Sequence, residues 1–465
     1  MAGSPPHAGK SFWLQDYGAY QPNADLARDL YCDVLVIGGG IAGLSAAWHA
    51  AKSSSGRVVL IESEVIGFGA SGRAAGWIMP QFGMDQVAIR KTYGDERAKA
   101  AFAYCLRAMN YTRETIAAQG LDSDYRHPGL MRVAFDDRWI GELEALHAML
   151  EDFGVPDLRW LEGAEVQAAF AGNRNFRAAS LDPNLGLLNP LKHVRSLKKL
   201  AASAGVEIFE NTPALHLERR TGGVHVATPR GSVRASKLVV ATNAFTHLLE
   251  GPLGREMRHL QSPVFARGAV TERLSPQQWS EIGWERGNAI ESTLDLFHYM
   301  APTRDGRIQF YWIYHGGHSR FGEMEPAASA EGAAASLDHL KRIFPRLRGV
   351  RLAHHWGGHM SGTCDLVPHL TTLGDDRVIY IGGCWGHGLA MSLLHGQTVA
   401  DMLNDTRSEL TDFWIVNRKP KPWPVRPFDH LGKGFHWHRL KRKALRRMAG
   451  SIFDDARPRG RGEQG

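Results

Sequence analysis

A glycine-rich turn between a short apolar strand and a helix constrains the fold of this chain more than any other feature. The segment CDVLVI at 32–37 has the composition of a buried strand, and RVVLIE at 57–62 that of a second one. Between them, GGGIAGLSAAWHAAK at 38–52 has the pattern of a tight turn that opens a helix. We therefore predict a βαβ unit near the N-terminus.

The spacing of residues within this unit fits a bound dinucleotide. Gly38, Gly40 and Gly43 form GxGxxG, in which the first glycine permits the turn, the second lets backbone approach a pyrophosphate and the third allows close helix packing. Glu62 ends the second strand, where a carboxylate accepts hydrogen bonds from the hydroxyls of an adenosine ribose. The pattern does not distinguish NAD from FAD, and a turn that only packs a helix on a sheet would also satisfy it.

The remainder of the chain predicts a mixed α/β protein of two or three domains, as its 465 residues allow. Helical spacing is present at 95–119, 190–204, 334–344 and 389–403. Strands are expected at 129–135, 206–209, 224–227, 238–242 and 377–383, and aromatic-rich strand-like segments at 296–300 and 308–314.

The positive charge of the chain is concentrated in its C-terminal tail. The formal net charge is +7, yet residues 411–465 hold 14 Lys and Arg against 5 Asp and Glu, which leaves the rest slightly acidic. A nucleic-acid partner is not expected, because it would need a basic face on the folded part. We expect the tail to be dispensable for cofactor binding.

Within the tail, a basic amphipathic helix is predicted around Lys441–Arg447. Such a helix would make a weak contact with an acidic membrane or a partner, or it would fold back on its own domain. Its apolar residues would be Phe435, Trp437, Leu440, Leu445 and Met448.

Cysteine and histidine spacing points to neither a disulfide framework nor a metal site. The four cysteines include no CxxC pair, which favours a reducing, cytoplasmic location. The N-terminus lacks a basic start followed by an apolar run. The histidines near the third cysteine are scattered, so no metal is expected. The residues concerned are Cys32, Cys105, Cys364 and Cys384, and His354, His355, His359 and His369.

Three further motifs, in order along the chain, carry a family resemblance. They are VIGFGASGRAAGWI at 65–78, WGGHMSGTCDLVPHL at 356–370 and IYIGGCWGHGLAMSLLHGQTVADML at 379–403. Together with the first turn they resemble the D-amino-acid oxidase superfamily of FAD-dependent amine oxidoreductases. Within it, the gamma-glutamylputrescine oxidoreductase branch is the most similar, and the likeness spans residues 12–405.

The resemblance implies an α/β fold with a Rossmann-like FAD-binding domain and a second, β-sheet-containing α+β substrate domain, as in glycine oxidase. An N-terminal extension at 1–30 and a basic C-terminal tail at 406–465 would flank them. The FAD-binding domain is expected at 31–83, 158–252 and 352–405, and the substrate domain at 84–157 and 253–351.

The resemblance also implies that FAD is held without a covalent bond. In sarcosine-oxidase relatives the attachment cysteine lies three residues before a threonine, and counting back from Thr363 gives Met360, a thioether that cannot form that linkage. The expected FAD contacts are Gly38, Gly40, Ile41, Ala42, Gly43, Glu62, Ser63, Gly69, Ala70, Ser71, Arg73, Gly76, Ala214, Ala241, Asn243, Gly383, Trp385, Gly386, His387, Gly388 and Leu389.

By resemblance, the chain oxidises the C–N bond of a primary or secondary amine, derived from an amino acid or a polyamine, to an imine. The electron acceptor would be O2 or a carrier. The alternatives are a flavin dehydrogenase or N-demethylase that uses an acceptor other than O2, and a non-catalytic FAD-binding subunit. The candidate catalytic residues are His387, Tyr299, Tyr311 and His298, with His315 as a further candidate.

Departures from the motifs of the family bear on the substrate and the acceptor. Ala301 stands where relatives often carry an arginine, which some use to hold a substrate carboxylate. Tyr311, Trp312 and Tyr314 add bulk where the branch has small glycines. Both differences disfavour a free amino acid held by its carboxylate. Some oxidases place a lysine near the flavin, but the only lysine between 251 and 350 is Lys341, on an expected surface helix.

Overall fold

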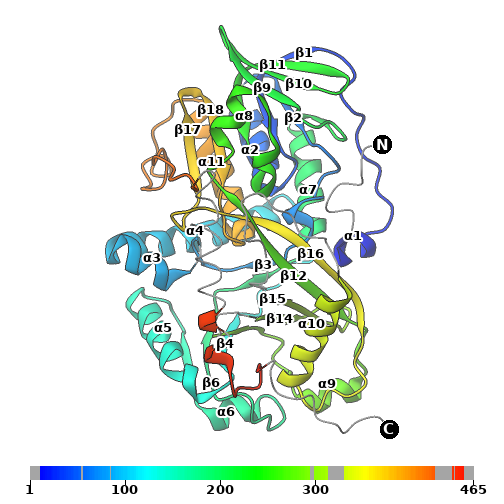
Figure 1. Ribbon diagram of the computed structural model, residues 1–465, viewed down its shortest axis with the longest axis vertical. Coiled ribbons are helices and arrows are strands. Elements are labelled where there is room, and N and C mark those ends of the chain that lie inside the picture. Colours follow the sequence, from blue (N-terminus) through cyan, green and yellow to red (C-terminus); the bar gives the residue numbers. More distant parts are fainter. Residues whose placement is uncertain are drawn as a thin grey trace.

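Two eight-stranded sheets form the frame of the molecule. In the computed structural model the first sheet lies in the upper half of Figure 1, most of the second lies in the lower half, and two long strands run between them. The structure describes residues 11–53, 56–83, 85–293, 298–312, 329–424, 442–444 and 446–454.

The first sheet has the strand order β17-β18-β11-β1-β2-β8, with β10 and β9 added beside β11. The pairs from β18 to β8 are parallel, whereas β17, β10 and β9 pair antiparallel. The strands are β1 (Leu30–Ile37), β2 (Val58–Ile61), β8 (Glu207–Phe209), β9 (His216–Arg220), β10 (Gly223–Thr228), β11 (Gly231–Val240), β17 (His369–Leu373) and β18 (Asp375–Gly382).

Both faces of this sheet are covered, as a parallel sheet requires. Val34 and Val36 of β1 pack on one face against three helices, whereas Leu35 and Ile37 pack on the other face against α8. This alternation follows from the two-residue period of a strand. The helices are α2 (Ile41–Lys52), α7 (Pro190–Ser203) and α11 (Gly388–Leu403) on the first face, and α8 (Gly251–Met257) on the second.

The second sheet has the order β16-β12-β15-β14-β13-β4-β6-β5, and only the β13–β4 pair is parallel among its described pairings. Its strands are β4 (Leu130–Ala134), β5 (Arg159–Leu161), β6 (Ala178–Asp182), β12 (Ser262–Thr271), β13 (Ala289–Ser292), β14 (His298–Pro302), β15 (Ile308–Trp312) and β16 (Leu352–Gly362). The helices around it are α5 (Ile140–Asp152), α6 (Gly163–Ala168), α9 (Pro276–Ile282) and α10 (Ala330–Ile343).

Helices α3 (Gln86–Tyr93) and α4 (Asp95–Ala118) lie at the side of the molecule in Figure 1. Cys105 of α4 is packed in one cluster with Met391 and Leu394 of α11. Part of the segment predicted as substrate domain therefore contacts the helix that follows the first sheet. The short elements η1 (Ala70–Gly72), β3 (Trp77–Ile78), β7 (Gly186–Leu187), η2 (Asp137–Trp139) and η3 (Asn243–Leu248) complete the fold.

Within the described residues the predicted helices and strands of the two domains are present, but the predicted limits of the FAD-binding segments are displaced. Strands β5 and β6 fall within 158–252, yet they pair in the second sheet. Strand β16 begins the segment 352–405, yet it pairs along its length with β12, from Ser262↔Gly362 to Thr271↔Leu352. The difference arises because the sheet that a strand joins depends on pairing partners far away in the chain.

The N-terminal segment is not a loose extension. Phe12 and Trp13 of α1 (Phe12–Asp16) are buried in the same cluster as the first face of the first sheet. Further along, the Tyr20 hydroxyl donates to Glu210 Oε1 at 2.7 Å and the Asn23 N–H donates to Glu210 Oε2 at 2.7 Å. Residues 11–30 of the segment predicted as an extension are therefore part of the folded structure.

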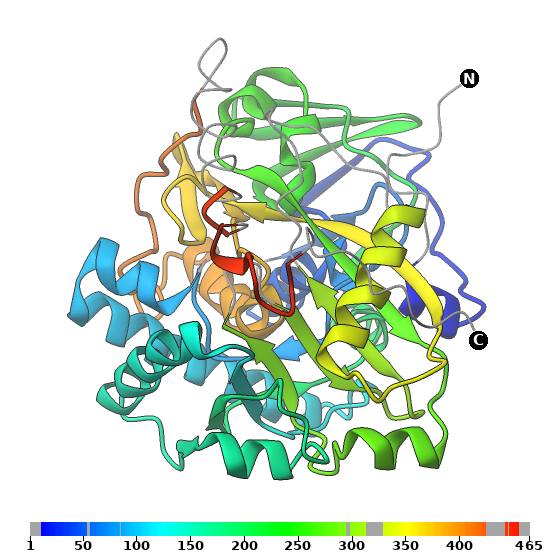
Figure 2. The same ribbon diagram turned by 60° about the horizontal axis from the view of Figure 1, so that its bottom comes forward.

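The described part of the tail also packs onto the protein, and for Met448 this agrees with the predicted alternative in which the segment folds back on its own domain rather than docking on a membrane. Met448 is buried together with Ala444 and Phe453 in the core of the second sheet. The segment that carries them is red in Figure 2 and lies near the centre of that view. The Arg138 guanidinium donates to the carbonyls of Arg447 and Ala449 and fixes this segment. The other predicted apolar residues, Phe435, Trp437, Leu440 and Leu445, lie outside the described residues.

Candidate functional site

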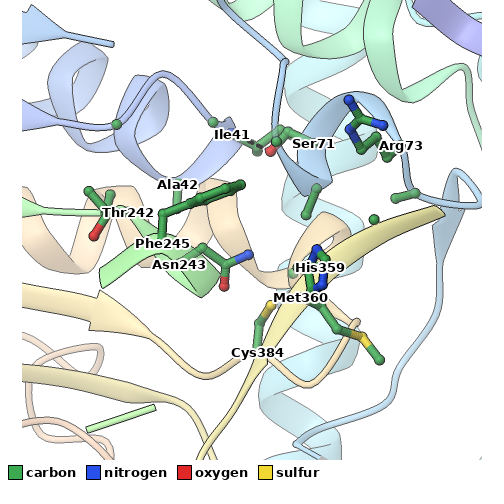
Figure 3. Close-up of a pocket in the computed structure, with 18 of the residues that line it drawn as sticks. Ile41, Ala42, Ser71, Arg73, Thr242, Asn243, Phe245, His359, Met360 and Cys384 are labelled. Carbon is green, nitrogen blue, oxygen red and sulfur yellow. Dashed lines mark hydrogen bonds between the residues drawn. The ribbon is translucent and has the colours of Figure 1, made fainter. Parts of the chain in front are cut away.

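A cavity of about 520 Å³ lies where three turns and the second sheet meet. The turns are the first turn (38–43), the GASGRAAG turn (69–76) and the C-terminal glycine turn (383–388). Its size is typical of a site for a cofactor or small ligand. In Figure 3, side chains from these segments surround the cavity, with Ile41 and Ser71 at one side and His359 and Met360 at another.

The first turn has the geometry that the GxGxxG pattern predicts. Gly38 has φ +114°, and a Cβ there would meet the Ala241 carbonyl oxygen at 2.6 Å, so only glycine fits. A Cβ on Gly43 would lie 1.9 Å from the Gly38 carbonyl oxygen, so this glycine brings α2 against the turn. A Cβ on Gly40, at the start of α2, would touch only Ser71 Oγ, at 3.0 Å.

Glu62 lies beside this turn and lines the cavity. Its Oε2 accepts a hydrogen bond from the Gly39 N–H at 2.6 Å, and its Oε1 accepts from the Glu64 N–H at 3.0 Å. Burial raises the pKa of Glu62, whereas these two backbone donors lower it. The carboxylate is thus oriented at the end of β2, where the sequence predicts an acid that binds the ribose.

The GASGRAAG turn is joined directly to the start of α2. Ser71 Oγ accepts a hydrogen bond from the Ile41 N–H at 3.0 Å (Figure 3). The Arg73 guanidinium donates to the carbonyls of Phe68 at 2.9 Å and Gly357 at 3.2 Å. Burial lowers the pKa of Arg73 to about 10, so it stays a cation near neutral pH. A fixed positive charge therefore lies at the cavity wall.

The C-terminal glycine turn closes the cavity at the N-terminus of α11. Trp385 has φ +51°, and its indole N–H donates to Thr363 Oγ1 at 3.1 Å. His387 Nδ1 lies 2.9 Å from the Gly83 carbonyl oxygen, so Nδ1 carries the proton of the neutral ring. Burial lowers the pKa of His387 to about 4, which makes it neutral at pH 7. The helix N-terminus supplies a partial positive charge at this wall.

Most of the predicted cofactor contacts line the cavity, and three do not. Gly43 packs α2 as described above. Gly76 has φ +77°, and a Cβ there would lie 2.0 Å from the Leu188 carbonyl oxygen. Gly383 has φ +78°, and a Cβ there would lie 2.1 Å from Thr363 Cγ2. These three glycines pack against neighbouring atoms and do not line the cavity, whereas the other predicted contacts do.

Three of the candidate catalytic residues line the cavity: His387, Tyr299 and Tyr311. The prediction for His298 is wrong, because neighbouring residues of a strand face opposite sides of the sheet. His298 is fully buried on the far side, where its Nε2 lies 2.9 Å from His339 Nδ1 and its ring stacks on Phe453. His315 and Tyr314 lie outside the described residues.

Tyr299 is backed by a buried cluster of charges. The Arg132 guanidinium lies 3.1 Å from Asp182 Oδ2 and 3.1 Å from Glu291 Oε2. Burial and the neighbouring Glu291 carboxylate raise the pKa of Tyr299 well above its usual value, so its hydroxyl stays protonated. One arginine thus faces two carboxylates behind the aromatic wall.

Several lining residues were not expected from the sequence. They include residues next to predicted ones, which their neighbours could have signalled, and aromatic or sulfur side chains of the second sheet and its surroundings, which no local pattern distinguishes from a plain core. They are Gly39, Trp77, Met79, Trp356 and His359.

The described residues show neither a metal-ligand cluster nor a disulfide. No three His, Cys, Asp or Glu side chains in those ranges are grouped as metal ligands would be. All four cysteines are free thiols. None of the described helices is long and apolar enough to cross a membrane.

The fold and the cavity define a class: a two-sheet α/β protein in which a GxGxxG turn and a glycine turn before the last long helix border one cavity. The model of the family of FAD-dependent oxidoreductases known as DAO matches residues 33–402. The chain belongs to this family, which confirms the resemblance seen in the motifs. The family is FAD dependent.

Individual relatives agree with this assignment. The chain is 28% identical over 429 residues to gamma-glutamylputrescine oxidoreductase of Escherichia coli (strain K12), covering 92% of this chain and 97% of that protein. It is 24% identical over 389 residues to glycine oxidase of Bacillus subtilis (strain 168), covering 82% and 95%. The crystal structure of glycine oxidase from Geobacillus kaustophilus has the same fold, with a TM-score of 0.69, 21% identity and coverage of 84% and 99%.

Proposed function

We propose that the protein binds FAD in an extended form across this cavity and oxidises the C–N bond of an amine to an imine. The observation that carries the proposal is that one cavity joins the GxGxxG turn to Tyr299 and Tyr311 on the second sheet. Gly38, Gly40 and Glu62 would hold the ADP half. The isoalloxazine ring would lie between the GASGRAAG turn and the start of α11. Bound there, FAD supplies a two-electron acceptor for the hydrogen of the carbon next to the amine nitrogen.

The residues of the chain prepare this reaction by orientation and charge. The N-terminus of α11 and the Arg73 guanidinium provide positive potential, which favours the negative charge of a reduced ring. Neutral His387 offers Nε2 as a hydrogen-bond acceptor, because Nδ1 donates to Gly83. The amine would bind against Tyr299 and Tyr311, with its α carbon toward the ring.

The substrate class that this wall favours is an amine whose α carbon carries no carboxylate. Trp77 and Tyr299 pack with ring centroids 4.5 Å apart, and Tyr311 packs on Trp356 at 5.4 Å. Ala301, where relatives carry an arginine, is buried behind this aromatic wall. Aromatic faces attract cationic or apolar amines, whereas the carboxylates around Arg132 repel an anionic group.

The electron acceptor is either O2 or a carrier. Lys341 lies on the outward side of α10 and does not line the cavity. Arg73 is the one arginine or lysine among the described residues that line the cavity, and it stays charged at neutral pH. This arrangement supports a carrier-linked dehydrogenase as the second candidate function. Four free thiols support a cytoplasmic location.

Non-covalent attachment is a separate part of the proposal. Met360 lines the cavity, and its Sδ lies 2.8 Å from where a Cβ on Gly386 would be, beside the glycine turn. Precipitation of the holoprotein with acid should release all yellow colour into the supernatant. Colour that stays in the pellet would contradict the proposal and would point to Cys384, the cysteine that lines the cavity.

Turnover tests the function itself. The purified protein is mixed with a panel of primary and secondary amines in air, with and without a redox dye. The expected result is one aldehyde or keto product for each two electrons transferred, with peroxide formed by an oxidase and dye reduced by a dehydrogenase. A protein that holds FAD but turns over no amine with either acceptor would support the non-catalytic alternative.

A further inference from the structure

Four consecutive carbonyl groups of the GASGRAAG turn each accept a hydrogen bond from a side chain outside the turn. The donors come from the N-terminal segment and from the second sheet. The pairs are Ser11 Oγ to Gly72 O at 2.6 Å, Trp356 Nε1 to Arg73 O at 3.0 Å, Trp13 Nε1 to Ala74 O at 3.0 Å, Tyr311 Oη to Ala74 O at 3.0 Å and Gln309 Nε2 to Ala75 O at 3.1 Å.

Trp13 occupies the centre of this arrangement. Its indole N–H lies 3.0 Å from the Ala74 carbonyl oxygen and 3.1 Å from the Tyr311 hydroxyl oxygen, so one donor is shared between two acceptors. The Tyr311 hydroxyl in turn donates to the same carbonyl. The three polar atoms form a closed, buried triangle, and each one fixes the position of the other two.

The helix that carries Trp13 is itself held in place. Ser11 Oγ caps α1 by accepting from the Leu14 N–H at 3.2 Å, and it also donates to the Gly72 carbonyl. Phe12 stacks on Trp356 with ring centroids 6.4 Å apart. The N-terminal segment therefore contacts the turn from outside the cavity, since Ser11 and Trp13 do not line the cavity.

We propose that Trp13 is a positioning residue of the flavin site: it holds the Ala74 carbonyl and the Tyr311 hydroxyl so that the turn keeps its carbonyl oxygens away from the flavin ring. This inference rests on the proposed function, because it requires FAD beside the turn. No sequence motif assigns such a role to the N-terminal segment.

The direction of the effect follows from the carbonyl dipole. A carbonyl that accepts a hydrogen bond points toward its donor. Without the indole N–H, the Ala74 carbonyl keeps one donor, the Tyr311 hydroxyl, which has itself lost the indole N–H as a partner. The carbonyl is then less firmly held and can turn toward the cavity, which brings the negative end of its dipole nearer the ring. Reduction adds negative charge to the ring, so the reduced form is disfavoured and the midpoint potential falls.

The test compares the holoprotein with Trp13→Phe, which keeps an aromatic ring but removes the N–H. Trp48→Phe is the matched control, because Trp48 belongs to the same hydrophobic cluster and does not line the cavity. The readouts are FAD content, melting temperature, the visible absorption spectrum and the flavin midpoint potential by dye equilibration. The expected result is a lower potential and a shifted spectrum for Trp13→Phe alone, with both variants equal in FAD content.

Tyr311→Phe provides a second, independent measurement. It removes the other donor to the Ala74 carbonyl and should lower the potential in the same direction, and the double variant should shift it by less than the sum of the two single shifts. An unchanged potential and spectrum in Trp13→Phe with FAD bound would overturn the inference. If Trp13→Phe fails to retain FAD, an unchanged potential in Tyr311→Phe would overturn it. A wild-type protein that binds no FAD would instead overturn the proposed function.

Discussion

At the scale of single residues, the glycines of the first turn have different structural roles although they belong to one motif. A Cβ on Gly43 would collide with backbone, whereas Gly40 faces the cavity and a Cβ there would meet only the Ser71 side chain. The motif predicts all of them from local sequence, because the turn conformation is a local property. It does not tell which glycine is needed for the fold and which for the ligand.

Gly40→Leu is expected to give folded but colourless protein. Its side chain would project into the cavity at the position of the pyrophosphate, and a Cβ meets only the Ser71 hydroxyl oxygen, at 3.0 Å. Flavin absorbance and far-UV circular dichroism measure the two properties. Gly141→Leu is the control, because a Cβ at Gly141 meets nothing within 4 Å and the residue does not line the cavity. Full flavin content in Gly40→Leu would contradict the placement of FAD.

Gly43→Ala should behave differently. The added Cβ would lie 1.9 Å from the Gly38 carbonyl oxygen, so α2 must move and the free energy of unfolding should fall. Urea unfolding compares the variant with wild type, both stripped of FAD so that ligand binding does not contribute. A stability equal to that of wild type would show that the helix tolerates the displacement.

At the scale of elements, periodicity locates helices and strands well but does not tell which face of a strand is functional. His298 and Tyr299 are neighbours on β14, and a strand turns one of them to the cavity and the other to the core of the second sheet. The choice depends on the pairing and packing of β14, which involve distant segments. For the same reason the sheet joined by β5, β6 and β16 was not predictable.

The terminal segments show the same limit. Composition marks residues 411–465 as a basic tail, yet Met448 and Phe453 fill the core of the second sheet. A few apolar residues in a charged segment suffice for docking when a complementary apolar surface is present elsewhere in the fold. The expectation that this segment is dispensable is therefore restricted to flavin binding and does not extend to stability.

Phe453→Ala is expected to lower the free energy of unfolding by about 3–5 kcal/mol, the usual cost of removing a buried phenylalanine side chain. Phe453 is fully buried and stacks on His298 with ring centroids 4.8 Å apart. Urea denaturation followed by fluorescence measures the change, and Val87→Ala, at a largely exposed position, is the control. If both variants are as stable as wild type, the segment does not pack as described.

At the scale of the whole molecule, the domains are joined by a shared interior rather than by a thin linker. Tyr311 and Trp356 of the second sheet belong to the same hydrophobic cluster as Val34 and Val36 of the first, and Trp13 of α1 is part of it. The cavity lies at this junction, so changes in stability of either sheet should reach the cofactor site. Protonation of buried histidines is one event that should change the stability of the protein in this way.

Stability is expected to fall as the pH drops from about 6.5 to about 4.5. Burial lowers the pKa of His193, His387 and His395 to about 4. The unfolded chain therefore binds protons in this window that the folded chain does not, and each histidine contributes at most about 1.4 kcal/mol per pH unit. Urea unfolding at several pH values measures the slope.

His193→Gln isolates one contribution to this slope. His193 is fully buried, lies 2.9 Å from Ser123 Oγ through Nδ1 and does not line the cavity. The variant should lose less stability than wild type between pH 6.5 and 4.5, whatever its stability at pH 7. An identical slope in the two proteins would show that His193 is accessible to protons in the folded state.

Anaerobic mixing of the yellow holoprotein with single amines tests the central claim most directly, because it follows the cofactor and the substrate in one step without an electron acceptor. We expect an amine that lacks a neighbouring carboxylate to bleach the flavin absorbance, with one imine-derived product formed for each flavin reduced. Gly40→Leu, prepared in parallel, should form no product. Flavin that stays oxidised with every primary and secondary amine, although dithionite reduces it, would contradict amine oxidation at this site.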